Sequence, residues 1–503
     1  MVPYRIFDTA TGIVICSMVV FGPWAFGTTQ PWSIWTMNAA GYVLGALWLL
    51  KRGTAWLQGF NPSPSGPAQS MNRGVTPPRV SSSSIAVLGM LTVLLLLYCL
   101  ISALNARASF NPQTATLDYH DTCLRWLPHS FDRPSTWFAF WTYLALACSF
   151  WSIRDWLQGG SLQEQWAAGR AERAGGAFDY QPEHRTLPLR LCRLLTVLTV
   201  NGGLVAAESI VQRLANCPKL LFLVTPEIHR TAITQFGPYA YQANGAQYLN
   251  LLWPVCLGFW WTLLAGKISP PKFRYSIFMC TGFIAAAALM SASRGGVFVG
   301  ISLLFITTLY LLTRVRFLPL QVKEATFVRR YAPALLLAPV VAAALGWHEL
   351  KPRKTGLAES WQRRQRIYEV ARNMAKEFGV FGSGPGTYAN VSALYLPETP
   401  GFWPAQVHND WLETRITFGF PGTVLVISVL AAIGLLWLGG RDPYEFVFLS
   451  GLALAGCLAH ARFDFPFQVH SILFLFVVIS AIVCVVSSRS PGAPPSTQAL
   501  SHN

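Results

Sequence analysis

The polar residues best suited to catalysis lie in one interval, 360–420, between apolar segments of membrane length. His408 comes just before an apolar span. An imidazole titrates near neutral pH, so His408 is the best candidate for a general base. The alternative is a structural histidine, because Asp410 and Glu413 do not share its face of a helix. The group that would orient the imidazole is not identified by this pattern.

A basic segment of the same interval is suited to binding an anion. The run Trp361–Glu377 predicts a helix that places Arg364, Tyr368 and Arg372 on one face, with Arg366 close by. Guanidinium groups bind diphosphate oxygens through paired hydrogen bonds. The alternative interpretation is an ordinary solvated surface helix.

Two further motifs have both a chemical and a structural interpretation. Arg294 lies between two apolar spans, where an arginine is costly unless it is paired, which makes it a second candidate for anion binding. The alternative is that its side chain reaches lipid phosphate. The run Gly382–Gly386 is rich in glycine like a phosphate-binding loop. However, Pro385 lacks an N–H and no strand precedes it, so a tight turn is the preferred interpretation.

Composition sets the class of protein that must position these groups. Apolar residues make up 52% of the chain and charged residues 12%, against about 25% charged in an ordinary soluble domain. Apolar runs of about 17–25 residues predict transmembrane helices. We therefore expect an all-α integral membrane protein with about 12 transmembrane helices, both termini inside, and a large helical outer loop. The expected spans are 9–27, 33–50, 84–104, 135–153, 188–210, 246–265, 275–293, 297–313, 331–347, 417–438, 444–461 and 468–487.

Four regions follow from this division of the chain. The first nine spans and their short loops occupy 1–348, and the large outer loop with the candidate site occupies 349–416. The last three spans occupy 417–487. A disordered inner tail is expected over 488–503.

Lysine and arginine residues set the expected orientation. The loops on the side of the termini are basic, as the positive-inside rule requires. The exception is 351–376, a basic segment on the opposite side, which suggests a bound anion. The alternative is that long loops cross the membrane regardless of charge. Basic inner loops facing anionic lipid account for most of the net charge of +16, so no nucleic-acid partner is needed.

The ten cysteines and the remaining motifs exclude several kinds of site. Only Cys123 and Cys217 fall in loops expected outside, where an oxidising periplasm would allow them to pair. No Cys/His spacing suggests a metal site, and we expect no cofactor. The chain has no Walker loop, no paired DxD for a nucleotide sugar and no GxSxG elbow.

The order of the motifs resembles that of the O-antigen ligase superfamily of bacterial membrane glycosyltransferases. The motifs that carry the resemblance are Phe236–Tyr239 leading to Asn244, Ser293–Gly296, Arg364 with Tyr368, Gly382–Gly386, His408–Glu413, Gly419 with Gly422, and His460 with Asp464–Pro466. They extend over roughly 230–480. The chain departs from the family pattern at Gln242, Ala243 and Gly245.

This resemblance implies a GT-C-like fold with its active site at the periplasmic face of the bacterial inner membrane. It implies that a glycan leaves undecaprenyl diphosphate for an acceptor hydroxyl, with inversion and without a metal. His408 would be the catalytic base, and Arg294 and Arg364 would contact the diphosphate with help from Arg366 or Arg372. The possible supporting residues are Asn409, Tyr368, Asn244 and Asp464.

Several functions stay open at this point. The family contains ligases that load lipid A core, polymerases that extend a growing glycan, and oligosaccharyltransferases that modify protein hydroxyls. An alternative of another class is a 12-span secondary transporter of an envelope component. Transporters place ionisable residues at mid-membrane, whereas here only Glu208 lies well inside an expected span.

Overall fold

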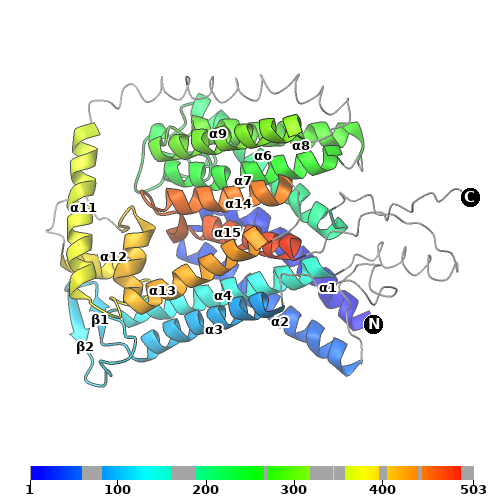
Figure 1. Ribbon diagram of the computed structural model, residues 1–503. Helices are drawn as coiled ribbons and strands as arrows, with labels where there is room; N and C mark the ends of the chain where they lie inside the picture. The colour runs from blue at the N-terminus through cyan, green and yellow to red at the C-terminus, as the bar shows by residue number, and fades with distance from the viewer. Residues whose placement is uncertain are drawn as a thin grey trace, which may run out of the picture.

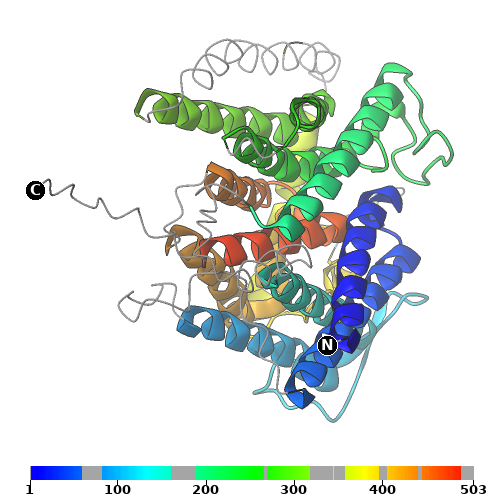
Figure 2. The same ribbon diagram turned by 90° about the vertical axis from the view of Figure 1, so that its right-hand side faces the viewer.

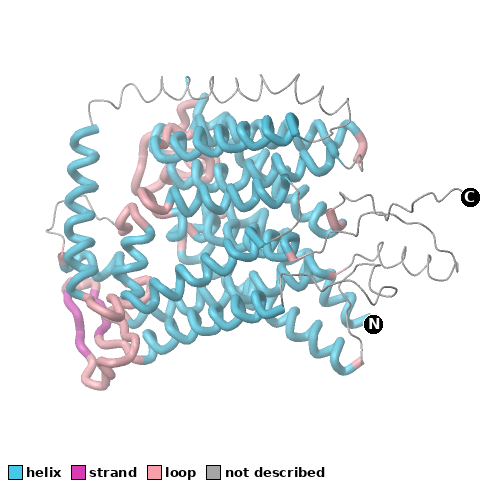
Figure 3. Tube along the Cα trace, in the orientation of Figure 1, coloured by secondary structure: helices cyan, strands magenta, loops and turns pink. Residues whose placement is uncertain are grey.

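A computed structural model describes residues 2–58, 82–159, 187–265, 269–317, 344, 357–395, 405–439 and 445–488. The described chain is almost entirely helical, and its strands form one short hairpin (Figure 3). The long helices run side by side in one bundle (Figure 1). The helices are α1 (Val2–Trp24), α2 (Pro31–Leu57), α3 (Ser82–Leu104), α4 (Arg133–Gln158), α6 (Leu189–Leu214), α7 (Gln242–Ala265), α8 (Pro271–Met290), α9 (Arg294–Phe317), α11 (Leu357–Glu377), α12 (Tyr388–Val391), α13 (Asp410–Gly439), α14 (Glu445–His460) and α15 (His470–Ser487).

Eleven of the twelve expected spans coincide with one of these helices. The span expected over 331–347 falls almost entirely outside the described residues. Nine helices of the described chain are long and apolar enough to cross a membrane. The fold is therefore that of an all-α membrane protein. Of the other two coincident helices, α14 has only 16 residues, and α4 is rich in Trp, Ser and Thr, which lower its hydropathy.

The bundle has two different ends (Figure 1). One end, called here the loop end, carries α11, α12 and the hairpin of β1 (Ala108–Asn111) and β2 (Thr116–Tyr119), which pair in antiparallel register. Helix α11 crosses this end at a steep angle to the bundle. At the opposite end, called here the terminus end, α1 begins and α15 ends.

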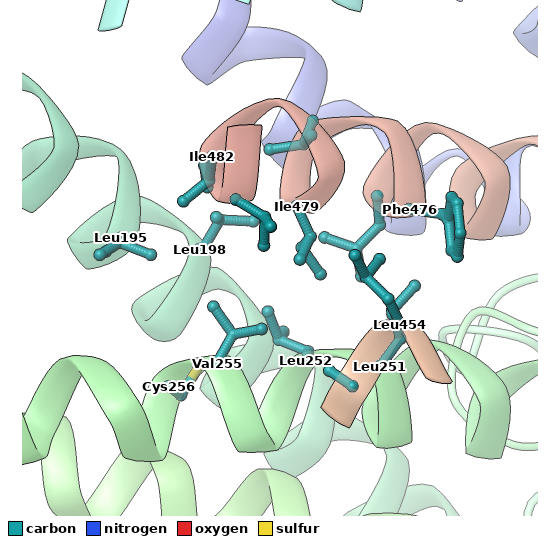
Figure 4. Close-up of a cluster of buried hydrophobic side chains, with 14 of the residues drawn as sticks. Leu195, Leu198, Leu251, Leu252, Val255, Cys256, Leu454, Phe476, Ile479 and Ile482 are labelled. Carbon is teal, nitrogen blue, oxygen red and sulfur yellow. The ribbon is translucent and has the colours of Figure 1, made fainter. Parts of the chain in front are cut away.

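The main core lies where α6, α7, α14 and α15 meet (Figure 4). Leu198 of α6, Leu252 of α7 and Ile479 of α15 are all nearly inaccessible to solvent. Helices α7 and α15 are buried on all sides, and neither has the exposed polar stripe of a surface helix. The amide side chains in the first half of α7, such as Asn250, are buried as well.

A cluster of buried charges fastens four helices at the terminus end. Lys51 of α2 is 2% exposed and pairs with Asp8 of α1 at 3.1 Å and with Asp155 of α4. Arg190 of α6 holds both carboxylate oxygens of Asp8. Arg52, which is half-exposed, also pairs with Asp155. Burial of these charges is tolerated because each has an opposite charge in contact.

Helix α13 is broken at Gly419, and the glycine-rich run Gly382–Gly386 packs against the break. Gly419 has φ +63°, outside the helical region. The amide of Phe420 donates to the Val380 carbonyl at 2.7 Å. The amides of Ser383 and Gly384 donate to the carbonyls of Ile416 and Thr417, in the last turn of α13 before the break. Gly382–Gly386 is therefore a tight turn, as expected, and the Ser383 and Gly384 amides are already used.

A tyrosine of α3 satisfies the carbonyls exposed at this break. The hydroxyl of Tyr98 lies 2.6 Å from the Phe418 carbonyl oxygen and 3.1 Å from that of Phe381. A β-carbon added to Gly419 would lie 2.0 Å from the Val380 carbonyl oxygen. The break therefore depends on a glycine at this position.

The two loop cysteines do not pair. Cys123 and Cys217 are both free thiols. The Cys123 thiol lies 3.6 Å from the Asn105 carbonyl oxygen, whereas Cys217 belongs to the turn that ends α6. The expectation of a disulfide between them was wrong, because each cysteine is fixed by its own local turn.

Candidate active site

His408 and Asp464 meet at the loop end of the bundle. Nδ1 of His408 lies 3.1 Å from Oδ1 of Asp464. The Asp464 side chain is 4% exposed and that of His408 is 24% exposed. A buried carboxylate that accepts Nδ1–H leaves Nε2 as the proton-accepting nitrogen of the neutral ring. In the described part of the chain, Nε2 has no hydrogen-bond partner.

The backbone at His408 is in an unusual conformation. Its φ is +56°, in the left-handed region that non-glycine residues rarely occupy. Such strain persists only where surrounding contacts hold it. One of these contacts is the hydroxyl of Tyr368, which donates to the His408 carbonyl at 3.0 Å.

The start of α13 holds the two loops that carry His408 and Asp464. The carboxylate of Asp410 accepts the Phe467 amide at 2.8 Å, and the Asp410 amide donates to the Ala461 carbonyl at 2.9 Å. Glu413 accepts the Val407 amide at 3.0 Å. Both carboxylates are buried. The acidic residues of the His408–Glu413 motif therefore position the loops, and Asp464 orients the imidazole.

Asn409 caps the same helix. Its side-chain oxygen accepts the amide of Leu412 at 3.2 Å. This is the contact that an N-cap residue makes with the third residue of its helix. Asn409 therefore contributes to the local fold beside His408.

Helix α11 packs against the loop end through one apolar stripe. Ile367, Ala371 and Met374 are buried on it, and Ala371 and Met374 join a second core that includes Val407 and Ile416. Exposed polar residues such as Arg366 and Glu369 lie on the other side, so α11 is an amphipathic surface helix. The packing places Arg364 and Tyr368 at the edge of the site.

Arg364 contacts the turn that carries Asp464. Its Nη1 donates to the Phe463 carbonyl at 2.9 Å. Burial raises the pKa of the Tyr368 hydroxyl, while the positive charges of Arg364, Arg462 and Arg372 act in the opposite direction. These three guanidinium groups therefore lie near enough to the Tyr368 hydroxyl to act on it. Arg366 is exposed and lies about 200° round α11 from Arg364.

Arg294 begins α9 beside the same turn. A β-carbon added to the adjacent Gly295 would lie 3.0 Å from the Phe463 ring and 3.2 Å from the His460 imidazole. The start of α9 therefore packs closely on the turn that follows α14. The Arg294 side chain is exposed there.

Asn244 lies in the first turn of α7 and is 5% exposed. Its Oδ1 has no hydrogen-bond partner within the described residues. Its amide donates to the carbonyl of Tyr241 at 3.0 Å, and the ring of Tyr241 lies beside His408. Asn244 is therefore linked to the site through the backbone. The structure therefore groups His408, Asp464, Arg364, Tyr368 and Arg372, with Arg294 packed beside their shared turn.

Aromatic residues that the sequence did not single out border the imidazole. The rings of Tyr241 and Phe465 stack at 5.6 Å, and both lie edge-on to His408, at 6.2 and 4.9 Å. His229 stacks on the other face of Tyr241 at 5.2 Å. Burial lowers the pKa of His229, and the charge of His408 adds to this effect. Arg462 was not among the site residues expected from the sequence either.

Imidazole and guanidinium groups predominate among the polar side chains of the site. Among the described residues, no three His, Cys, Asp or Glu side chains gather as a metal site requires. What the arrangement offers is an oriented proton acceptor next to several guanidinium groups. Such a pair of features can remove a proton from one group while stabilising negative charge on another.

The apolar helices define a polytopic membrane protein whose site lies at one end of the bundle. Residues 279–427 match the family model described as O-Antigen ligase. The resemblance to the O-antigen ligase superfamily is thereby confirmed. The matched segment includes Arg294, Arg364 and His408, whereas Asp464 and Tyr241 lie outside it. No curated protein matches the chain.

Proposed function

We propose that this protein is an inverting, metal-independent membrane glycosyltransferase that uses a glycan on undecaprenyl diphosphate. The observation that carries the proposal is the His408–Asp464 pair at 3.1 Å, on the same turn that Arg364 contacts. The family match supports a transferase of the O-antigen ligase kind. The lipid-linked donor is our inference from the arginines and from the absence of a nucleotide-sugar motif in the sequence.

The reaction requires one proton acceptor and one anion site. The acceptor hydroxyl gives its proton to Nε2 of His408, while its oxygen forms a bond to the anomeric carbon. The bond from this carbon to the diphosphate oxygen breaks on the opposite face, which inverts the centre. The electron pair leaves with the diphosphate. Asp464 holds the imidazolium that forms.

Arginines stabilise the leaving diphosphate in this scheme. Arg364 contacts the turn that carries Asp464, Arg372 lies one turn of α11 beyond Tyr368, and Arg294 begins α9 beside the same turn. Positive groups that are fixed before reaction stabilise developing charge most effectively, because they need not reorganise. We assign Arg366 a secondary role, since it lies on another face of α11.

We further propose that the loop end faces the periplasm from the inner membrane. Among the described residues, Lys51 and Arg52 of α2, Arg154 of α4 and Arg190 of α6 lie near the terminus end, in agreement with the positive-inside rule. The acceptor is then a hydroxyl of lipid A core, of a growing glycan, or of a protein.

The decisive experiment reconstitutes the purified protein in liposomes with a radiolabelled undecaprenyl-diphosphate glycan. Each acceptor class is added separately, and transfer of label is followed. We expect transfer to one class only, with release of undecaprenyl diphosphate. Movement of the intact donor across the bilayer without transfer would instead identify a transporter. No transfer to any acceptor, with folded protein, would contradict the proposal.

A further inference from the structure

The loop between α6 and α7 carries large apolar side chains outside the membrane-length helices. Phe222, Leu223, Val224 and Ile228 form what we call the apolar finger. Their side chains are 42%, 75%, 45% and 73% exposed. Exposed residues of this size are ordinary on a lipid-facing helix. In a loop, a group of four indicates a surface that binds something apolar.

The finger is held firmly at its base. The buried side chain of Gln235 donates from Nε2 to the carbonyls of Pro218 and His229, at 3.1 and 2.8 Å. Nε2 of Gln212 donates to the Lys219 carbonyl at 2.9 Å. The loop therefore presents these side chains in a defined arrangement.

The backbone of the finger is strained as well. Leu221 and Phe222 have φ values of +51° and +62°. This region is rare for bulky side chains. Conformations of this kind cluster at binding sites, where surrounding contacts maintain them.

Helix α6, which leads into the finger, also exposes apolar side chains. Leu204, Val211 and Leu214 are 57%, 55% and 74% exposed, and their spacing places them on one face of the helix. In Figure 2, α6 and the green loop after it lie at the rim of the bundle. Apolar side chains are therefore exposed both on the helix and in the loop that follows it.

Cationic residues flank the finger on both sides. Lys219 precedes it and Arg230 follows it, and both are exposed. Glu227 is the one acidic residue in the segment 217–231. Apolar side chains flanked by Lys and Arg are typical of segments that lie in the membrane interface, where cations meet lipid phosphates.

We propose that the apolar finger inserts among the lipid acyl chains at the loop end of the bundle, with Lys219 and Arg230 at the phosphates. The same loop ends at Tyr241, whose ring lies beside His408. The finger would thus hold the loop that borders the site against the membrane surface. This inference does not depend on which reaction the site performs.

The experiment measures the depth of single positions. In a variant with all ten cysteines replaced, Leu223→Cys and Asn373→Cys are each labelled with an environment-sensitive fluorophore. Asn373 is an exposed residue of α11 and serves as the matched control. The proteins are reconstituted in phosphatidylcholine vesicles, with or without bromine on the acyl chains. We expect bromine to quench the label at 223 several-fold more than the label at 373.

Two other results would overturn the proposal. Water-like emission at 223, without quenching, would place the finger in solvent. Apolar emission without quenching would place it against protein, such as a second copy of the chain. If the cysteine-free variant does not fold, carbene footprinting of the unaltered protein in vesicles answers the same question. Labelling of 222–228 by a carbene reagent confined to the acyl chains would then support insertion. Absence of such labelling would contradict it.

Discussion

The imidazole of His408 and the carboxylate of Asp464 lie 3.1 Å apart, although 56 residues separate them in the chain. The two loops meet because Asp410, at the start of α13, binds the backbone on both sides of Asp464. A helix that follows one loop therefore fixes the other. This relationship makes the proposed base and its orienting group a single unit.

Replacing either member of this unit should abolish most of the transfer. We expect His408→Ala to lower the rate by about 10²–10⁴-fold, with donor binding nearly unchanged. Asp464→Ala should cause a loss of the same kind, because the imidazole would no longer be oriented. The double variant should lose little more than His408→Ala alone, since the two residues act together. Near-normal transfer by His408→Ala would make the histidine structural.

Replacing Arg364 should weaken donor binding as well as transfer. Loss of a charge-assisted contact costs about 1.5–3 kcal/mol, or roughly ten- to a hundred-fold in the donor Kd. Arg364→Lys should restore only part, because an ammonium cannot form paired hydrogen bonds. Arg366→Ala is the matched control on the same helix. Equal losses for Arg364→Ala and Arg366→Ala would mean that only the total charge of α11 matters.

The break in α13 should be intolerant of side chains. Gly419→Ala places a β-carbon against the Val380 carbonyl at a positive φ, and the backbone term alone costs about 1–2 kcal/mol. We expect a clear fall in Tm in detergent. Gly434→Ala, in the same helix with nothing within 4 Å of the added carbon, should leave Tm unchanged or slightly raised. A similar Tm for both variants would argue against a rigid break.

The orientation can be tested with one cysteine at each end, in a variant whose ten native cysteines are replaced. Asn373→Cys lies on exposed α11, and Gly53→Cys lies near the end of α2, where an added β-carbon meets nothing within 4 Å. In intact cells, an impermeant maleimide should label position 373 and spare position 53. Labelling of position 53 alone would reverse the topology and move the site to the cytoplasm.

The buried charge cluster should depend strongly on Lys51 and weakly on its neighbour. Lys51→Ala leaves two carboxylates without their shared cation, and breaking a buried pair costs about 3–5 kcal/mol. Arg52→Ala removes a half-exposed partner of the same aspartate and should cost less than about 1 kcal/mol. Thermal unfolding in matched detergent measures both. A larger loss of stability for Arg52→Ala than for Lys51→Ala would show that Asp155 depends mainly on Arg52.

Most of the fold follows from patterns that a sequence displays directly. Apolar runs of membrane length located eleven helices, because length and hydropathy are local properties. The expected span at 417–438 covers only the part of α13 around and beyond the break at Gly419. The segment Asp410–Phe418 is helical too, because Asn409 caps it and its buried carboxylates hold two loops.

The site was accessible to sequence reasoning only in part. His408 and Arg364 have side chains whose chemistry is recognisable in isolation. The function of Asp464 depends on a contact between distant segments, and Tyr241 is even farther from His408 in the chain. Arg366 and Arg372 were expected to assist Arg364 equally, because the sequence does not say which helical face packs. The buried stripe of α11 shows which face packs on the site: Arg364 lies at its edge and Arg366 lies on another face.

The charge cluster at the terminus end also constrains how the chain is built into a bilayer. Lys51 and Asp8 already neutralise each other when α1 and α2 have emerged as a hairpin. Asp155 arrives with α4, and Arg190 completes the cluster from α6. Each of these two charges therefore finds an opposite charge on a helix made earlier. Synthesis from the N-terminus would close the cluster in chain order, before the residues of the site have been made.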